Sequence, residues 1–475
     1  MGTRDCRDVA AATYAKRRLS MFRGIVTRRW PEISLFLFGC ALRIALGSSY
    51  NVRLGYDFYD HARNIAWWMQ HADLPPIDWS RAAYHPPLYY VLAGRLARAG
   101  LGFTGLGLIS VALGCLRLGL LVAALELYLP RQRMARLVAL ALAAVLPASV
   151  HMDVMVTNEG LAATLSMLAL VLLPLVFSDS TRTRWYGAVG LGFALGLAIL
   201  TKVSSLVIVA ALCAAALFQF ARDSAGGTRG RLQRLAPMLT ALAIVVLCSG
   251  WYFAWCKVHY GKAFITGFDS WRSKASLLHA DKPYWNRRPP GYLLGWNLDI
   301  YAFPFYPSAA LPRARFFPQL VAATFADYYN YGLAPYPGVG DATRLANQRP
   351  ARPAIVRPAS VSVGAGTLIA LISVVAWAAA WVVCWRQRAH AMLGLLLVPL
   401  LAVAGQAHFA VTVANDTEGL VKGSYLQFGV APLFALFGLG VAWLWRHRPY
   451  RFLAALGLTA LLAVAWYVVF CIFVA

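Results

Sequence analysis

The sequence predicts an all-α polytopic membrane protein. Of its 475 residues, 60% are hydrophobic and only 13% are charged, a composition that soluble domains do not show. The mean hydropathy is +0.59, and apolar runs of about 20 residues, the length that crosses a bilayer, recur along the whole chain. Lys and Arg give a net charge of +25, but they collect in short loops at alternate ends of these runs. That is the positive-inside pattern, which sets orientation and does not indicate nucleic-acid binding.

We predict about eleven membrane-spanning helices, each close to the length that a bilayer requires. The first follows a basic cytoplasmic tail without an evident small-residue cleavage site, so it should stay as an anchor. Arginines close every inner loop, which places the N-terminus in the cytoplasm and the C-terminus outside. The expected spans are 32–50, 105–129, 137–154, 160–177, two arms of a hairpin with its tip at 201–204, 236–257, 362–385, 391–411, 425–445 and 453–473.

The spans divide the chain into regions. Residues 259–360 form a large outer region rich in aromatics and proline, without the alternation of a β domain, and we expect juxtamembrane helices and loops there. Its aromatics suit the membrane interface, which Trp and Tyr prefer, or stacking on a sugar. The regions are the tail 1–30, a module of spans 1–7 at 31–258 with an acidic outer loop at 51–104, the periplasmic region 259–360, and the final spans at 361–475.

The first outer loop concentrates acids and histidines. Its polar residues have the spacing of one helix face and lie beside an apolar stripe, which predicts a short helix on the membrane surface. Pro75 and Pro76 end this helix, and Pro87 can open the next one. His85 precedes a proline and is therefore extended. The polar residues are Asp57, Asp60, His61 and Asn64, and the stripe is Phe58, Ala62, Ile65 and Met69.

Polar residues converge on the outer face, whereas the cytoplasmic loops hold almost only arginine. In a bacterium, ATP and nucleotide sugars are absent from the outer compartment, and no phosphate-binding GxxxxGK[ST] loop occurs. A lipid-carried substrate is therefore favoured. The converging residues are Asp57, Asp60, His61, His85, Asp153, Glu159, Lys202, His408, Glu418 and Lys422.

Asp57 is the candidate general base. A carboxylate near the membrane loses solvation, so its pKa should rise and it can accept a proton from a hydroxyl. The alternative is that Asp57 caps or solvates the surface helix. Asp60 is a second catalytic candidate, although Arg63 is close enough to neutralise it. His61 could orient Asp57 or serve packing alone.

Cations and further acids suggest where a phosphate or a metal could bind. Lys202, at the tip of a short hairpin, and Lys422 could neutralise a leaving phosphate, or they could simply snorkel at the interface. Arg43 lies inside span 1 and must snorkel or find an anion. A divalent cation with oxygen ligands could be held by carboxylates, namely Asp57, Asp153 and Glu159. The eight cysteines have neither CxxC nor metal-ligand spacing.

Taken together, these segments resemble the membrane-embedded C-type glycosyltransferase superfamily, in particular the branch similar to protein O-mannosyltransferases and the lipid A aminoarabinose transferase. The likeness runs through most of the chain. It comprises Tyr56-Asp57 with His61, His85-Pro86-Pro87-Leu88-Tyr89-Tyr90, Arg117, Thr157-Asn158-Glu159-Gly160-Leu161-Ala162-Ala163, Leu200-Thr201-Lys202, Phe325-Ala326-Asp327-Tyr328-Tyr329 and Gly423-Ser424-Tyr425-Leu426.

The resemblance implies transfer of a sugar from a polyprenyl-phosphate carrier to a lipid, glycan or protein acceptor at the outer face of the inner membrane, with inversion. It makes Asp57 the catalytic aspartate of the first loop and brings Lys202 to the carrier phosphate. The chain departs from the family at Glu159, where Asp is frequent, at Ser424, where Arg is frequent, and at Asp60, which does not adjoin Asp57. The candidate substrate and carrier-phosphate contacts are Arg43, His85, Tyr89, Glu159, Lys202, Lys422 and Tyr425.

Two other functions stay open from the sequence. A transporter or flippase of lipid-linked sugars would place polar residues deep within several spans, whereas the span interiors here are mostly Leu, Ala and Val. A non-catalytic assembly protein of the cell envelope could share the fold, because fold alone does not establish function.

Overall fold

A computed structural model gives the arrangement of the chain. It describes residues 29–178, 180–222, 227–266, 269, 282–302, 304–305, 315–327, 353–387, 390–412 and 421–473. Within these ranges the secondary structure is helical, and no strand occurs. Most of the tail 1–30, much of the region 259–360, and Glu418 lie outside the described residues.

The polytopic all-α prediction is confirmed. Among the described residues, eight helices are long and apolar enough to cross a membrane. Three predicted spans correspond to shorter helices, which are α5 (Arg133–Val145), α9 (Leu206–Arg222) and α15 (Ala431–Arg446). The eight are Arg29–Ser49, α4 (Phe103–Tyr128), α7 (Asn158–Val176), α8 (Thr181–Thr201), α10 (Gly227–Tyr260), α13 (Pro353–Gln387), α14 (His390–Thr412) and α16 (Arg451–Phe473).

The predicted span 137–154 is not one helix. It divides into α5 and the short helix α6 (Pro147–Met152), with Leu146 in an extended conformation between them. Proline has no N–H for the preceding turn, and it forces the residue before it out of the α region. The break lets the chain turn before it reaches Asp153, which comes directly after α6.

The predicted span 425–445 also begins later than expected. The 3-10 helix η6 (Gly423–Leu426) precedes α15, which starts at Ala431 with Pro432 in its first turn. At Gly423, an added Cβ would lie 2.4 Å from the Ala323 carbonyl oxygen of α12 (Phe316–Phe325). Only glycine allows η6 to lie this closely on α12.

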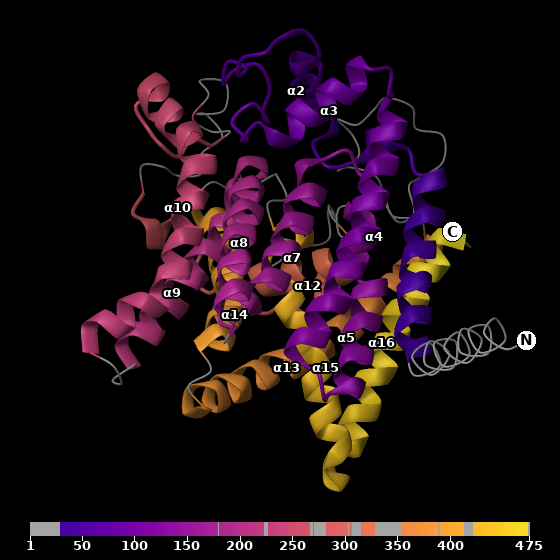
Figure 1. Ribbon diagram of the computed structural model, residues 1–475. Coiled ribbons are helices and arrows are strands. Elements are labelled where there is room, and N and C mark those ends of the chain that lie inside the picture. The colour runs from indigo at the N-terminus through magenta and orange to yellow at the C-terminus, as the bar shows by residue number, and fades with distance from the viewer. Residues whose placement is uncertain are drawn as a thin grey trace, which may run out of the picture.

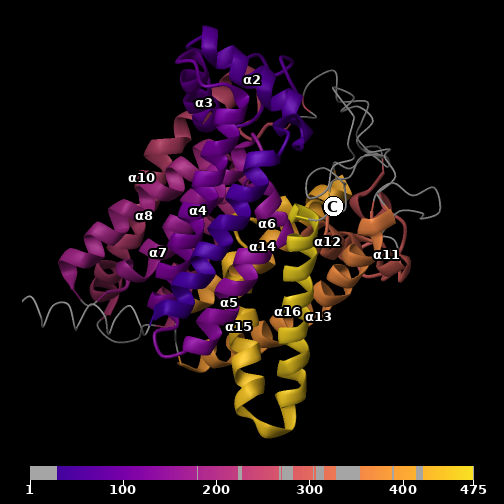
Figure 2. The same ribbon diagram turned by 90° about the vertical axis from the view of Figure 1, so that its right-hand side faces the viewer.

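The helices form a bundle with two different ends (Figure 1). The helices α7, α8 and α10 pack side by side, and α4 lies against α7. A second group joins α13, α15 and α16, with α5 against α15. The α15–α16 turn extends away from the bundle at the end opposite α2 (Figure 2). Arg446 at that turn bonds to Gln132 in the arginine-rich loop before α5, so these basic loops share one end.

The opposite end, which we call the α2 end, carries the predicted loop helix. It is α2 (Phe58–Gln70), and it packs on α3 (Leu88–Arg98), which Pro87 precedes as predicted. The two helices lie over the ends of α4, α7 and α8 (Figure 1). His61 and Asn64 face inward together with the apolar residues of α2, so this face contacts the rest of the protein.

Candidate active site

Asp57 stands at the start of α2 in an unusual conformation. Its φ is 53°, and it is the one non-glycine residue with positive φ in the described part of the chain. This left-handed region costs about 1 kcal/mol for most residues but less for aspartate, and it is held where the surroundings demand it. The side chain makes no capping hydrogen bond to α2, which removes the simplest structural explanation for it.

The carboxylate of Asp57 instead faces Lys422, the residue before η6. The two atoms Oδ2 and Nζ lie 3.1 Å apart. The side chain of Lys422 is 10% exposed and that of Asp57 is 55% exposed. The Lys422 ammonium lowers the pKa of Asp57 to about 2. The expectation that the membrane surroundings raise this pKa is therefore wrong for this state, because the neighbouring cation outweighs the loss of solvation.

A second ion pair joins Lys202 to Glu159. Lys202 ends α8, as the hairpin prediction required, and its Nζ contacts Oε1 of Glu159 in the first turn of α7. A carboxylate is favoured there because the N-terminus of a helix carries partial positive charge. Both side chains are largely buried, at 12% and 9% exposure.

Tyr425 in η6 lies between these two pairs. The Lys202 ammonium is 4.5 Å from the centre of its ring, and the Lys422 ammonium is 5.3 Å from it. Burial raises the pKa of the Tyr425 hydroxyl to about 12, so the ring stays neutral and attracts both cations. We call Asp57, Lys422, Tyr425, Lys202 and Glu159 the charged array.

Tyr56 adds a second ring beside Lys422, at 4.8 Å from its Nζ. From the sequence alone, Tyr56 had no role beyond its place next to Asp57. The sequence places Tyr56 and Asp57 next to each other. It does not reveal that Asp57 forms an ion pair with Lys422 and that Tyr56 contacts the same ammonium group with the face of its ring. Lys422 therefore contacts one carboxylate and two aromatic rings.

His61 does not orient Asp57. Its Nδ1 lies 2.8 Å from the Tyr90 hydroxyl and its Nε2 lies 3.3 Å from the Thr157 hydroxyl, so both ring nitrogens are engaged elsewhere. Burial lowers the pKa of His61 to about 4. The neutral imidazole therefore joins α2 to α3 and to the residue that caps α7.

His85 lies next to this bridge. Its ring is parallel to that of His61, with centres 6.2 Å apart, and it also contacts Tyr84. Burial, and then the charge of Lys202, hold its pKa well below the usual value. A neutral His85 beside Lys202 can offer a hydrogen bond to a ligand without adding charge.

The other two first-loop candidates have structural contacts. Asp60 accepts a hydrogen bond from the backbone N–H of Arg81 at 2.9 Å and so fixes the segment between α2 and α3. Burial raises the pKa of Asp60. Tyr89 is buried on α3 with its ring edge-on to Tyr90.

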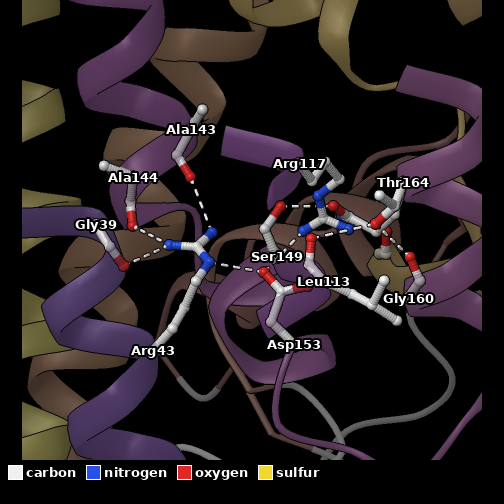
Figure 3. A network of polar contacts seen from close by, with 12 residues as sticks. Gly39, Arg43, Leu113, Arg117, Ala143, Ala144, Ser149, Asp153, Gly160 and Thr164 are labelled. Atoms are coloured by element: carbon white, nitrogen blue, oxygen red, sulfur yellow. Dashed lines mark hydrogen bonds and ion pairs between the residues drawn. The ribbon is translucent and has the colours of Figure 1, made fainter. Parts of the chain in front are cut away.

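Arg43 and Asp153 lie in a different network inside the bundle (Figure 3). Arg43 is 0% exposed, its Nε donates to Asp153 Oδ2 at 2.7 Å, and Arg117 Nη2 donates to the same oxygen at 2.9 Å. The two terminal nitrogens of Arg43 donate to the carbonyls of Gly39, Ala143 and Ala144 at 2.9 to 3.2 Å. Arg43 has thus found an anion and does not snorkel. We call Arg43, Asp153 and Arg117 the deep network.

Glycine makes room for the deep network. A Cβ at Gly114 of α4 would lie 2.4 Å from Asp153 Cγ, so any larger residue would displace the carboxylate. Each of the three guanidinium nitrogens of Arg43 donates to a protein atom, and the side chain is fully buried, so Arg43 is not placed to contact a carrier phosphate. Arg43 therefore belongs to the deep network and not to the charged array, although it was a candidate contact of the carrier phosphate.

The carboxylates proposed as metal ligands are not assembled together. Among the described residues, no group of three His, Cys, Asp or Glu side chains could hold a metal ion. Asp57 pairs with Lys422, Glu159 with Lys202, and Asp153 with two arginines. Ser424 is buried and does not replace the missing arginine, whereas Lys422, two residues earlier, reaches the array.

Comparisons with known proteins bear on the fold. No protein-family model matches the sequence, and no curated protein matches it significantly. The crystal structure of the Archaeoglobus fulgidus oligosaccharyltransferase, tethered with an acceptor peptide, is similar over 94% of this chain, with a TM-score of 0.52 and 12% identity. This chain covers 55% of that one, about half its length.

The Cupriavidus metallidurans ArnT has also been solved in two states. The structure bound to undecaprenyl phosphate gives a TM-score of 0.39 at 18% identity, over 87% of this chain and 77% of that chain. The apo structure gives 0.38 at 17% identity, over 90% and 78%. At such identities structural likeness speaks for fold and not for activity. This chain therefore shares the fold of the Archaeoglobus fulgidus oligosaccharyltransferase.

Proposed function

We propose that this protein is an integral-membrane glycosyltransferase that uses a polyprenyl-phosphate-linked sugar. The observation that carries the proposal is the charged array, in which a carboxylate and two lysines from distant segments meet at the α2 end. In this proposal the α2 end faces the periplasm, the protein lies in the inner membrane, and the arginine-rich loops and N-terminus are cytoplasmic.

The reaction assigned to the array is an inverting displacement. The acceptor hydroxyl attacks the anomeric carbon, the new C–O bond forms as the bond to the carrier phosphate oxygen breaks, and Asp57 receives the hydroxyl proton. The leaving group is the polyprenyl phosphate, whose added negative charge is stabilised by Lys202 and Lys422. The acceptor is a lipid, a glycan or a protein of the envelope.

Lysines are one source of the positive charge that the leaving phosphate needs. The alternative is a divalent cation, which the carboxylates of the site do not favour because each of them pairs with a lysine. One measurement distinguishes lysines from a metal ion as the source of this charge. Chelation by EDTA leaves the rate unchanged if lysines supply the charge and abolishes it if a metal does.

The test measures release of undecaprenyl phosphate, which every such transfer produces. Purified protein in nanodiscs is given a panel of undecaprenyl-phosphate-linked monosaccharides with envelope lipids, glycans and peptides as acceptors. We expect release with at least one donor, and loss of release in Asp57→Asn. Asp60→Asn is the matched control, because it removes the same charge three residues away. Absence of release with every donor, or full release in Asp57→Asn, contradicts the proposal.

The deep network is the observation that favours a second candidate function, a flippase of lipid-linked sugars. Charged groups inside a span often mark a translocation path, and Arg43, Asp153 and Arg117 are such groups. A flippase would move a fluorescent polyprenyl-phosphate sugar across a liposome membrane without breaking its sugar–phosphate bond. Translocation without turnover would replace the transferase by this candidate.

A further inference from the structure

Both lysines of the charged array already have carboxylate partners in the chain itself. Lys422 is bound to Asp57, the proposed base, and Lys202 is bound to Glu159. An incoming phosphate must therefore compete with a carboxylate for each ammonium group. A carboxylate held by an ammonium is also a poor proton acceptor, because the cation stabilises its charged form.

The two pairs differ in how easily they can open. Asp57 is 55% exposed, so water can solvate its carboxylate after Lys422 leaves it. Glu159 is only 9% exposed, and a buried carboxylate that loses its cation is strongly destabilised because water cannot solvate its charge. The Asp57–Lys422 pair is therefore the one that a ligand can exchange.

The aromatic rings favour such an exchange. Lys422 lies over Tyr56 and Tyr425 as well as beside Asp57. These cation–π contacts continue to hold the ammonium while its carboxylate partner is replaced. Lys422 therefore keeps two aromatic contacts when its carboxylate partner changes.

We propose that the phosphate of the lipid-linked donor takes Lys422 from Asp57 and thereby converts Asp57 into a competent base. The inference rests on the proposed function and adds its regulation. Before the donor binds, Asp57 is held by Lys422 and does not activate an acceptor hydroxyl. The donor therefore binds before the acceptor reacts, and Glu159 keeps Lys202 in place throughout.

The competition predicts an unusual binding result. Loss of the Asp57 charge should tighten binding of the carrier phosphate, because Lys422 no longer has to leave a carboxylate. A partly exposed ion pair corresponds to a gain of up to about fivefold in affinity. Two variants suit the left-handed backbone of position 57, because Asn and Gly both tolerate positive φ: Asp57→Asn and Asp57→Gly.

The experiment measures the affinity of undecaprenyl phosphate for the full chain in nanodiscs. We expect tighter binding to Asp57→Asn and Asp57→Gly than to wild type, and a change of less than about twofold in Asp60→Asn, whose carboxylate bonds to a backbone N–H. Thermal unfolding confirms that each variant is folded. Unchanged or weaker binding in either Asp57 variant overturns the exchange but leaves the proposed function standing. A wild-type protein that does not bind undecaprenyl phosphate overturns both.

Discussion

The charged array and the deep network contain the same kinds of residue but have different roles. Each joins carboxylates to cations, but the array uses lysines over aromatic rings and leaves Asp57 half exposed. In the deep network two arginines share one fully buried carboxylate, and Arg43 also donates to backbone carbonyls. One arrangement can exchange partners with a ligand, and the other cannot.

The difference shows why an ionisable residue within the membrane does not by itself indicate a site. Arg43 and Asp153 are more deeply buried than any residue of the array, yet they hold the Arg29–Ser49 helix, α4 and α6 together. Guanidinium groups suit that role because they form several directed hydrogen bonds at once. Ammonium groups are point charges on long stems, which suits binding and release of a phosphate.

The largest effect on stability is expected from a substitution in the deep network. Asp153→Asn leaves Arg43 and Arg117 buried without their anion, and breaking a buried pair in this way costs about 3–5 kcal/mol. We expect a large fall in the melting temperature and in yield. Asp60→Asn, which loses a carboxylate from a less buried position, should melt close to wild type. A native melting temperature for Asp153→Asn would show that the network is not a structural element.

A smaller effect is expected from Lys202, the lysine that remains paired with Glu159, and it concerns the KM for the donor. Lys202→Met removes one charge from the proposed phosphate site and keeps a long apolar chain over Tyr425. We expect the KM for the donor to rise by about tenfold or more, the scale of one lost charged contact. The matched variant Lys262→Met removes a lysine that pairs with Asp269 outside the array. Equal donor kinetics in the two variants would remove Lys202 from the site.

The smallest effect is a pH dependence of the stability that comes from His61, which joins α2 to α3 and to Thr157. The pKa of His61 falls from 6.5 to about 4 in the folded protein, so between these values the unfolded chain binds more protons. Stability is therefore complete above pH 6.5 and decreases as the pH falls toward 4. Melting temperatures should fall from pH 7 to pH 4.5, and His61→Gln should fall less. Parallel curves for the two proteins would show that His61 does not carry this dependence.

Much of the fold could be predicted from the sequence, because apolar run length and arginine placement are local signals. They located the long spans, the tip at Lys202 and the helix that follows Asp57. Two helices were misjudged where proline acts within an apolar run, at Pro147 and at Pro432. Hydropathy alone does not register a missing N–H.

The candidate site was only partly predictable. Its residues were found by type, but the pairing of Asp57 with Lys422 joins positions 365 residues apart, and nothing local specifies it. The pKa of Asp57 was predicted in the wrong direction for the same reason, since burial was visible in the pattern and the partner was not. From the sequence, Arg43 could either snorkel or pair with an anion. The position of Asp153 after the α5–α6 break decides for the ion pair.

The most direct test compares Asp57→Asn with wild type in release of undecaprenyl phosphate, at equal amounts of folded protein. General bases contribute about 10²–10⁴-fold to rate, and Asp57 makes no contact that holds the deep network. We therefore predict a rate at least about 100-fold lower with an unchanged melting temperature. Asp57→Asn protein that melts normally and releases the carrier at the wild-type rate would contradict the assignment of catalysis to the charged array.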